Sequence, residues 1–313
     1  MILFQGQKLG KYEIIDSLGS GGFASVYKAI DTWLGKVVAI KIPHQQSGDL
    51  NKLLEEPRLL AKLEHENIVK LYSAEKEDNI FFIVMEYIEG SSLEDILQEK
   101  YRLSVQESVM IIKQICSAVD YAHLNNIIHR DLRPANILIE KDGKVRVGDF
   151  GISKLLANTN YAKTVIGTPP YMAPEQFEGK TVFASDLYSI GVIFYEMLTG
   201  TVPFYDPNPT ILKKKLMEER LTPPRVHNPS IPQSINDVIE KCLQKDVSLR
   251  YQRAADILTD LELCVSGTAL QRELAEIRKR IKAKETVKTR HCFNCNKILP
   301  PRVSRCPYCG EAQ

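Results

Sequence analysis

Hydrophobic and polar positions divide the chain into two parts, and the pattern predicts a small, mostly β lobe followed by a larger α lobe. Before Gly90, short β-branched and apolar runs alternate with glycine and polar breaks, as is typical of strands. One segment there, residues 50–63, carries leucines at helical spacing and is interrupted by Pro57. Beyond Gly90 most apolar positions follow helical spacing, with short strand-like runs near 137–148. The predicted helices lie near residues 92–100, 104–125, 185–199, 209–219, 232–244 and 253–265.

Composition narrows the class of protein. The 313 residues are 44% hydrophobic and 26% charged, which is typical of an ordinary globular protein. The longest apolar run, around Ile190 to Leu198, is too short to span a bilayer. No basic segment followed by an apolar stretch opens the sequence. We therefore expect a cytoplasmic protein with no membrane partner.

The C-terminal part differs from the rest in charge. Residues 269–313 carry 11 Lys and Arg against 4 Asp and Glu, whereas residues 1–268 carry 30 against 35. Apolar residues from Leu270 to Ile281 recur at a spacing of 4, 3 and 4. That spacing leaves two interpretations open, a coiled coil or a single amphipathic helix. Two heptads are marginal evidence for a coiled coil, so we favour the single helix.

Two segments of the N-terminal lobe indicate an anion-binding site. The hairpin LGSGGFASV, residues 18–26, contains three glycines, so its backbone N–H groups can come close to an anion. A glycine hairpin alone is weak evidence, because such hairpins are common. The run VAIK that follows ends in Lys41, whose ammonium would lie under the hairpin.

Three polar residues further along carry metal and proton-transfer chemistry. Asp131 lies in HRDLRPANILI, five residues before Asn136, and Asp149 ends a strand-like run in VGDFG. Asn136 and Asp149 offer hard oxygen atoms, which suit Mg²⁺ sharing its shell with phosphates. Asp131 lies on a loop fixed by apolar neighbours, where it can accept a proton from a substrate hydroxyl.

Together with MAPE at residues 172–175, these motifs resemble in order and spacing those of eukaryotic-type serine/threonine protein kinases, in a form common in bacteria. The resemblance covers roughly residues 9–266 and implies the bilobal protein kinase fold, which is an α+β fold. It places the N-lobe at about 9–87 and the C-lobe at about 88–266. Residues 267–290 would then be a basic helical linker.

The resemblance implies roles for the residues named above. Lys41 would bind the α- and β-phosphates of ATP, Asn136 and Asp149 would hold Mg²⁺, and Asp131 would be the catalytic base. The acidic partner of Lys41, found by counting back from HENIV, is Glu56. Because Pro57 directly follows it, and proline in a helix interior costs about 3 kcal/mol, Glu55 stays open as an alternative.

Further positions follow from the same resemblance. Asp186 would anchor the catalytic-loop backbone, Glu175 and Arg250 would form a buried ion pair, and His129 would stack with Phe150 in a structural spine. The hinge VMEYIEG would offer backbone groups to adenine, although the residues expected to enclose the ring could equally serve the core. The implied ATP-binding residues are Gly19, Ser20, Gly21, Gly22, Val26, Ala39, Lys41, Glu86, Ile88 and Leu138.

The segment before MAPE bears on substrate class and regulation. GTPPYMAPEQ resembles serine/threonine kinases, in which the position of Thr168 hydrogen-bonds near the catalytic aspartate. Arg130 is typical of kinases whose activation segment is ordered by phosphate, because a fixed guanidinium binds a dianion. Thr164 aligns with the usual phosphorylation site, and Thr159 and Tyr161 are weaker candidates.

Two positions depart from the family pattern. Ala24 replaces the third glycine of the glycine-rich hairpin. Arg133 stands where serine/threonine kinases usually have a lysine that reaches the γ-phosphate. An arginine is always charged and can fork onto phosphate oxygens, so we interpret Arg133 as a tolerated variation with the same catalytic role.

Four of the seven cysteines lie in the last segment, residues 291–313, as two CxxC pairs. Cys292, Cys295, Cys306 and Cys309 have the spacing of a zinc ribbon, and so short a segment would depend on Zn²⁺ for folding. Such a ribbon could bind a partner protein, bind nucleic acid or cap the kinase. Nucleic acid is less favoured, because only Phe293 and Tyr308 could stack on bases.

The sequence therefore predicts an ATP- and Mg²⁺-dependent serine/threonine kinase acting on protein substrates. A different class stays open beside it. The alternative is a pseudokinase scaffold whose ribbon docks a partner, and the intact Lys41, Asp131, Asn136 and Asp149 argue against it.

Overall fold

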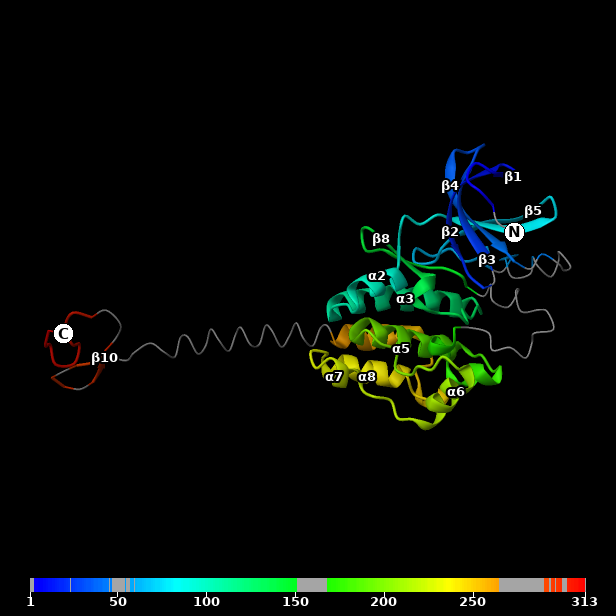
Figure 1. Cartoon of the computed structure of the whole chain (residues 1–313). Coiled ribbons are helices and arrows are strands. Elements are labelled where there is room, and N and C mark those ends of the chain that lie inside the picture. The colour runs from blue at the N-terminus through cyan, green and yellow to red at the C-terminus, as the bar shows by residue number, and fades with distance from the viewer. Residues whose placement is uncertain are drawn as a thin grey trace. The chain divides into compact units, whose positions relative to one another are not determined.

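The computed structural model describes residues 3–22, 24–44, 46, 54, 57–58, 60–150, 168–264, 290–292, 294–295, 297–299 and 303–312. The chain divides into two units, Met1–Leu261 and Glu262–Gln313. In the first unit a strand lobe adjoins a helical lobe (Figure 1), so the predicted bilobal α+β architecture is confirmed. Among the described helices, none has the length and apolar character needed to cross a membrane.

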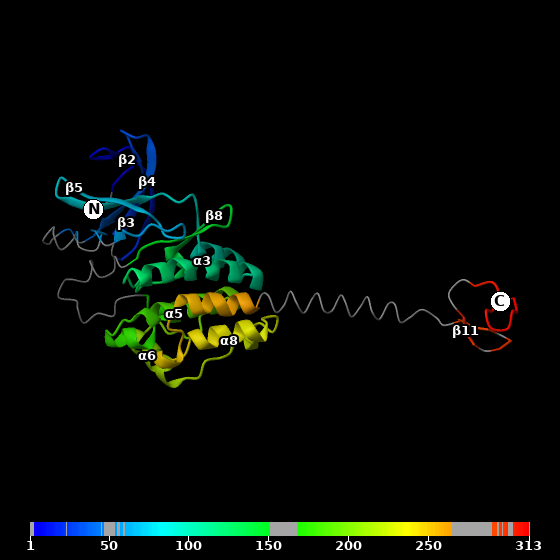
Figure 2. The same ribbon diagram turned by 180° about the vertical axis from the view of Figure 1, so that it is seen from behind.

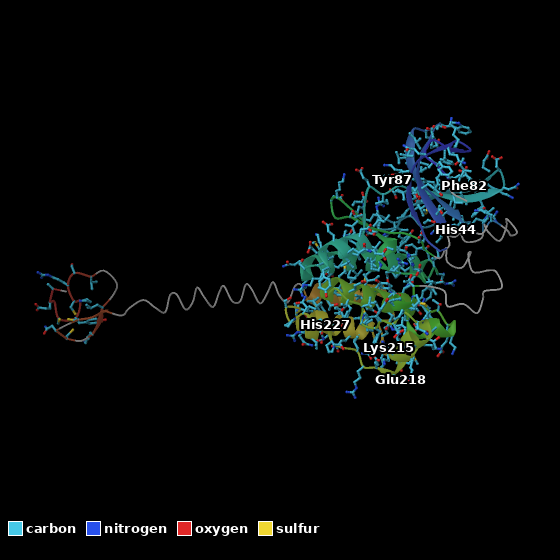
Figure 3. The ribbon with its side chains drawn as sticks, in the orientation of Figure 1. His44, Phe82, Tyr87, Lys215, Glu218 and His227 are labelled. Carbon is cyan, nitrogen blue, oxygen red and sulfur yellow. The ribbon has the colours of Figure 1, made fainter. Side chains whose placement is uncertain are left out.

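The strand lobe is an antiparallel sheet with strand order β1-β2-β3-β4-β6-β5. The fourth strand is buried from Val38 onward and pairs with a neighbouring strand on each side. Phe82 packs edge-on against Tyr12 with ring centroids 5.9 Å apart, inside the core of this lobe (Figure 3). The strands are β1 (Lys8–Leu9), β2 (Tyr12–Ser20), β3 (Ala24–Asp31), β4 (Lys36–Pro43), β5 (Leu71–Glu77) and β6 (Ile80–Glu86).

The helical lobe is organised around α5, which lies between α3 and α8 in both views of the ribbon (Figures 1 and 2). Nearly every side chain of α5 is buried, as expected of a helix that is apolar on all faces. At Gly191 an added Cβ would lie 2.5 Å from Cys242 Cβ, so only glycine allows α8 to come this close. The helices are α2 (Leu93–Lys100), α3 (Val105–Leu124), α5 (Phe183–Thr199), α6 (Pro209–Glu218), α7 (Pro224–His227), α8 (Gln233–Cys242) and a last one over residues 254–264.

Two helix starts follow directly from the sequence. The side chains of Ser92 and Ser104 each accept a hydrogen bond from the backbone N–H three residues later. The carboxylates of Asp95 and Glu107 in turn accept a hydrogen bond from the backbone N–H of the serine. These capping boxes satisfy helix N–H groups that have no intrahelical acceptor. They fix the starts of α2 and α3 within one residue of the predicted helices.

A small sheet at the junction of the lobes places the polar loops. Its strands, in the order β7 (Gly90–Ser92), β8 (Ile137–Glu140) and β9 (Val145–Val147), are antiparallel. β8 begins directly after Asn136, and β9 ends two residues before Asp149. The pairing of β8 with β9 therefore brings these two residues to the same end of the sheet.

The second unit contains a two-stranded antiparallel sheet of β10 (Arg290–His291) and β11 (Ile298–Leu299). Cys292 and Cys306 are buried together with Leu299. The predicted linker, residues 267–290, lies outside the described residues apart from Arg290.

Candidate active site

A buried carboxylate on α5 fixes the loop that carries Asp131. Asp186 Oδ2 accepts the backbone N–H of His129 at 2.8 Å, and Oδ1 accepts that of Arg130 at 2.9 Å. His123 Nε2 lies 2.7 Å from Asp186 Oδ2. Arg130 has a φ of 72°, a left-handed conformation that is costly for a residue with a side chain. These bonds hold the loop in that conformation.

Asp131 has a defined orientation. Its Oδ1 accepts the backbone N–H of Thr168 at 3.1 Å and the Thr168 hydroxyl at 3.3 Å. Its own N–H donates to His129 Nδ1 at 3.3 Å. His129 is fully buried, and its Nε2 lies 2.8 Å from the carbonyl oxygen of Gly148. Asp131 thus has one carboxylate oxygen bound by Thr168, while Oδ2 makes, among the described residues, only a long contact of 3.4 Å to Asn136 Nδ2.

Asn136 faces Asp131 through its amide nitrogen. Asn136 Nδ2 donates to the Asp131 backbone carbonyl at 2.7 Å. The backbone carbonyl of Asn136 accepts the N–H of Gly148 at 2.9 Å, which ties the loop to the residue before Asp149. Because an amide nitrogen only donates, the side-chain carbonyl oxygen Oδ1 is the atom that can bind a cation.

Lys41 and Asp149 form an ion pair across the two lobes. Lys41 Nζ lies 2.7 Å from Asp149 Oδ1, and Asp149 has a φ of 60°. Burial acts to raise the pKa of Asp149, but the charge and hydrogen bond of Lys41, together with smaller contributions from His129 and Arg133, outweigh it, so that the pKa lies below its usual value. Asp149 is therefore an anion at neutral pH. The next residue, Phe150, packs against His129 with ring centroids 4.5 Å apart.

The donor set of Asn136 and Asp149 fits magnesium. Mg²⁺ takes few protein oxygens and keeps the remainder of its octahedral shell for water and phosphate. Asn136 Oδ1 and the Asp149 carboxylate would supply two such oxygens, and Lys41 Nζ lies 2.7 Å from Asp149 Oδ1.

The guanidinium of Arg133 is held at two of its nitrogens. Nη1 donates to Thr168 Oγ1 at 3.0 Å, and Nη2 donates to Glu94 Oε1 at 2.9 Å. Sequence reasoning did not single out Glu94, because an acidic residue in the first turn of α2 is already accounted for by the helix dipole.

The glycine-rich hairpin has a polar cluster that sequence reasoning also missed. Ser25 Oγ lies 3.0 Å from Ser20 Oγ across the hairpin and 3.1 Å from His44 Nε2. His44 Nδ1 lies 3.3 Å from the carbonyl oxygen of Gly22, and Figure 3 labels His44 on the strand lobe. A serine opposite a serine on paired strands could have indicated part of this cluster.

The residues implied to bind adenine lie on neighbouring strands and the hinge. Val26 pairs in register with Lys41, and Ala39 pairs with Met85 next to Glu86. The N–H of Glu86 donates to the carbonyl oxygen of Lys70 at 2.8 Å.

Several predicted residues lie outside the described part of the chain. They include the acidic partner of Lys41 and the phosphorylation candidates of the activation segment. These residues are Glu55, Glu56, Thr159, Tyr161 and Thr164.

The C-lobe ion pair expected from the resemblance is present. Arg250 Nη1 and Nη2 lie 2.8 and 3.2 Å from the two carboxylate oxygens of Glu175, and the Arg250 side chain is fully buried. Burial acts to raise the pKa of Glu175, but its hydrogen bonds from Arg250 and Ser185 lower it below the usual value. Gln176, the next residue, donates to the carbonyl oxygen of Arg130 at 3.1 Å. The segment held by the Glu175–Arg250 ion pair thus also contacts the loop that carries Asp131.

In the second unit, the four cysteines form one cluster. The Sγ atoms of Cys292, Cys295, Cys306 and Cys309 all lie within 4.8 Å of one another, and two of the distances are 3.6 Å. A tetrahedral Zn–S shell with bonds of about 2.3 Å needs sulfur separations of about 3.8 Å, so the cluster fits zinc. Backbone N–H groups of Cys295 and Tyr308 donate to Cys292 and Cys306 at 3.4 Å.

The pKa values of the thiols indicate that four ionised cysteines would need a positive charge beside them. The N–H of Cys295 lowers the pKa of Cys292 to about 6. The N–H of Lys297 acts to lower the pKa of Cys295, but burial and the neighbouring thiols raise it to about 12. Once one thiol is ionised, the others resist ionisation, so four thiolates together need a metal charge beside them.

Comparison with known proteins gives the family. Residues 12–260 match the protein kinase domain. A probable serine/threonine-protein kinase of Clostridium perfringens is 39% identical over 265 residues, which are 82% of this chain and 39% of that protein. The serine/threonine-protein kinase PrkC of Bacillus subtilis is 36% identical over 277 residues, 86% of this chain and 43% of that protein. PknB of Mycolicibacterium smegmatis is 36% identical over 272 residues, 83% and 44% of the two chains.

The chain spans about two fifths of the length of these curated relatives. The matched region contains every described residue of the first-unit site, from the glycine-rich hairpin to Arg250. The sequence motifs, the two-lobed architecture and the match over most of the chain agree, and the chain belongs to the protein kinase family.

Proposed function

We propose that this chain is an ATP-dependent serine/threonine protein kinase. One observation carries the proposal: Asp131, Asn136, Lys41 and Asp149 lie in a single hydrogen-bonded and ionic site, each with a side-chain atom suited to its proposed role. Two of its relatives are named serine/threonine-protein kinases, which supports the substrate class. A chain that uses ATP and keeps four cysteines reduced for a metal is expected to act in the cytoplasm.

In this proposal the substrate hydroxyl loses its proton to Asp131, which Thr168 holds in place. The hydroxyl oxygen attacks the γ-phosphorus, the bond to the bridging oxygen breaks, and ADP leaves. Lys41 binds the α- and β-phosphates, while Arg133 stabilises charge on the transferred group. Asn136 and Asp149 would hold Mg²⁺, which would neutralise charge on the phosphates.

The same proposal includes regulation at the activation segment. Among the described residues, nothing accepts a hydrogen bond from the buried Nε of Arg130. A phosphate on Thr164 would supply that acceptor and order the segment. Thr164 itself lies outside the described residues, so this role rests on the sequence and on Arg130.

We also propose that the second unit is a zinc ribbon. The donor set of four close sulfur atoms supports Zn²⁺, and the exposed Tyr308 ring, with Lys297 Nζ 4.8 Å from its centroid, offers a contact surface for a partner protein.

The test is phosphoryl transfer from ATP to a protein substrate in the presence of Mg²⁺, with the modified residue mapped. Asp131→Asn should lower kcat by about 10²-fold or more, because the proton acceptor is lost. Its melting temperature should stay near that of the unsubstituted chain, since Asp131 makes few buried bonds. Transfer at an unchanged rate in Asp131→Asn would contradict the assignment. A stable chain that binds ATP without transfer would favour the scaffold alternative.

A further inference from the structure

Arg133 is fixed by two acceptors that come from different parts of the chain. Thr168 precedes the MAPE segment, and Glu94 lies in the first turn of α2, 39 residues before Arg133. Glu94 can reach it because Ser92 caps α2 and begins the helix beside the catalytic loop. The guanidinium is therefore anchored both by α2, through Glu94, and by the segment before MAPE, through Thr168.

The unusual arginine makes this arrangement chemically distinct. A lysine ammonium on a flexible stem would share one nitrogen among all its acceptors, whereas a planar guanidinium presents separate nitrogens in a fixed plane. With Nη1 on Thr168 and Nη2 on Glu94, the plane of the group is defined. Its orientation no longer depends on side-chain rotamer freedom.

The third nitrogen of the group indicates what this orientation serves. Arg133 Nε is buried and, within the described residues, makes no hydrogen bond. A buried N–H without an acceptor is unfavourable, and an arriving anionic oxygen would satisfy it. The remaining N–H bonds of Nη1 and Nη2 add further donors for the same anion.

We propose that Glu94 is a positioning residue, which holds the Arg133 guanidinium in the orientation that stabilises the γ-phosphoryl group during transfer. This inference rests on the proposed kinase function. Glu94 acts through Arg133 and does not touch the reacting atoms. The electrostatic attraction between Glu94 and Arg133 contributes little, because the Glu94 side chain is 40% exposed and the Arg133 side chain 28%. The contribution lies in geometry.

A competing role for Glu94 is to bind a basic residue of the substrate. Glu196 accepts a hydrogen bond from the Tyr171 hydroxyl at 2.8 Å. Burial is the main cause of the raised pKa of Glu196, and the nearby charge of Glu94 raises it further. Two carboxylates near each other could attract a cation. This role would act on substrate affinity, whereas positioning of Arg133 acts on the chemical step.

The experiment is a double-mutant cycle read as kcat and KM. In the otherwise unsubstituted chain, Glu94→Ala should lower kcat about 10-fold and change the KM for ATP and for the peptide less than about 2-fold. Glu94→Gln keeps an acceptor oxygen and should recover most of that loss. In the Arg133→Lys background the single ammonium cannot keep the two-sided anchor, so adding Glu94→Ala should cost less than about 2-fold.

Controls separate positioning from charge and from folding. Glu99→Gln removes a carboxylate from an exposed position on the same helix and should leave kcat unchanged. Melting temperatures of all variants should agree within a few degrees. An equal loss from Glu94→Ala in both backgrounds, or a loss confined to the KM of a lysine-containing peptide but absent with a neutral one, would overturn the positioning role. If the unsubstituted chain transfers no phosphate at all, the proposed function itself has failed.

Discussion

The catalytic loop and the cysteine cluster reach a fixed geometry by different means. Asp186, which holds the loop, is 1% exposed and lies on a helix buried on all sides, 57 residues from the His129 N–H that it binds. The cluster lies within residues 292–309, and the described buried side chains around it are Cys292, Cys306 and Leu299. The loop is held by a large hydrophobic core, whereas the proposed zinc ribbon would depend on its bound ion.

The largest expected effect separates the two regions through the metal. Cys306→Ser, or a strong chelator, should unfold the second unit, because structural zinc contributes about 10–16 kcal/mol of apparent binding energy at neutral pH in small zinc domains. Zinc per chain, measured by atomic emission, should fall from about one to near zero. Cys264→Ser lies outside the cluster and is the matched control. Melting of the first unit should not move in either variant, and a metal-free native chain would rule out the ribbon.

The next prediction tests whether the buried Asp186 controls the rate of phosphoryl transfer. Asp186→Asn leaves one acceptor oxygen where two now serve His129 and Arg130, so the loop should shift. We expect kcat to fall about 100-fold, since a displacement of about 1 Å at a reacting group costs that much. Asp256→Asn, at an exposed helix position, should leave kcat unchanged. A variant with full kcat would show that the loop is held without Asp186.

The third effect concerns the ion pair beneath the loop. Arg250→Met leaves the Glu175 carboxylate buried without its partner and should reduce the free energy of unfolding by about 3–5 kcal/mol at pH 7. The pKa of Glu175 in the folded protein lies below the usual 4.5, so its favourable contribution is complete above pH 4.5 and is lost as the pH falls through the lower value.

Without Arg250 the direction reverses, because burial then dominates and raises the pKa of Glu175. The difference in stability between the two proteins should therefore shrink as the pH is lowered from 7 towards 4. Urea titrations at several pH values measure it. A difference that is constant with pH would mean that Glu175 is not the group responsible.

The smallest effect compares two equivalent helix caps. Ser92→Ala and Ser104→Ala should each cost about 1 kcal/mol of unfolding free energy, because each removes one capping hydrogen bond. Only Ser92 begins the helix that carries Glu94, so only Ser92→Ala should also lower kcat. Equal kcat values in the two variants would show that the start of α2 does not influence the orientation of Arg133.

Local signals allowed much of the fold to be predicted. The helical spacing of apolar residues predicted a helix near 104–125, and α3 spans Val105–Leu124. The β-branched run at 36–43 predicted β4 for the same kind of reason. The resemblance indicated Asp186 as the loop anchor and Thr168 as a neighbour of the catalytic aspartate, and both contacts are present.

Other parts of the site could not be predicted, because they depend on which side chains meet after the lobes have packed. Glu94 and Arg133 share no spacing rule, and their contact exists only because α2 lies against the catalytic loop. His44 and Ser25 likewise meet at the end of two strands, where register decides the neighbours. The Lys41–Asp149 pair joins residues from both lobes, whereas the resemblance had assigned Asp149 to Mg²⁺ and Glu56, which lies outside the described residues, to Lys41.

The bonds from Asp186 to the catalytic loop also bear on the dynamics of this segment. Amide protons in loops ordinarily exchange with solvent through small local openings. The His129 and Arg130 amides lie in a loop, yet their acceptor is a carboxylate rooted in the most deeply buried helix of the lobe. Their deuterium uptake should consequently be as slow as that of α5 itself, so that the loop opens only when the lobe does.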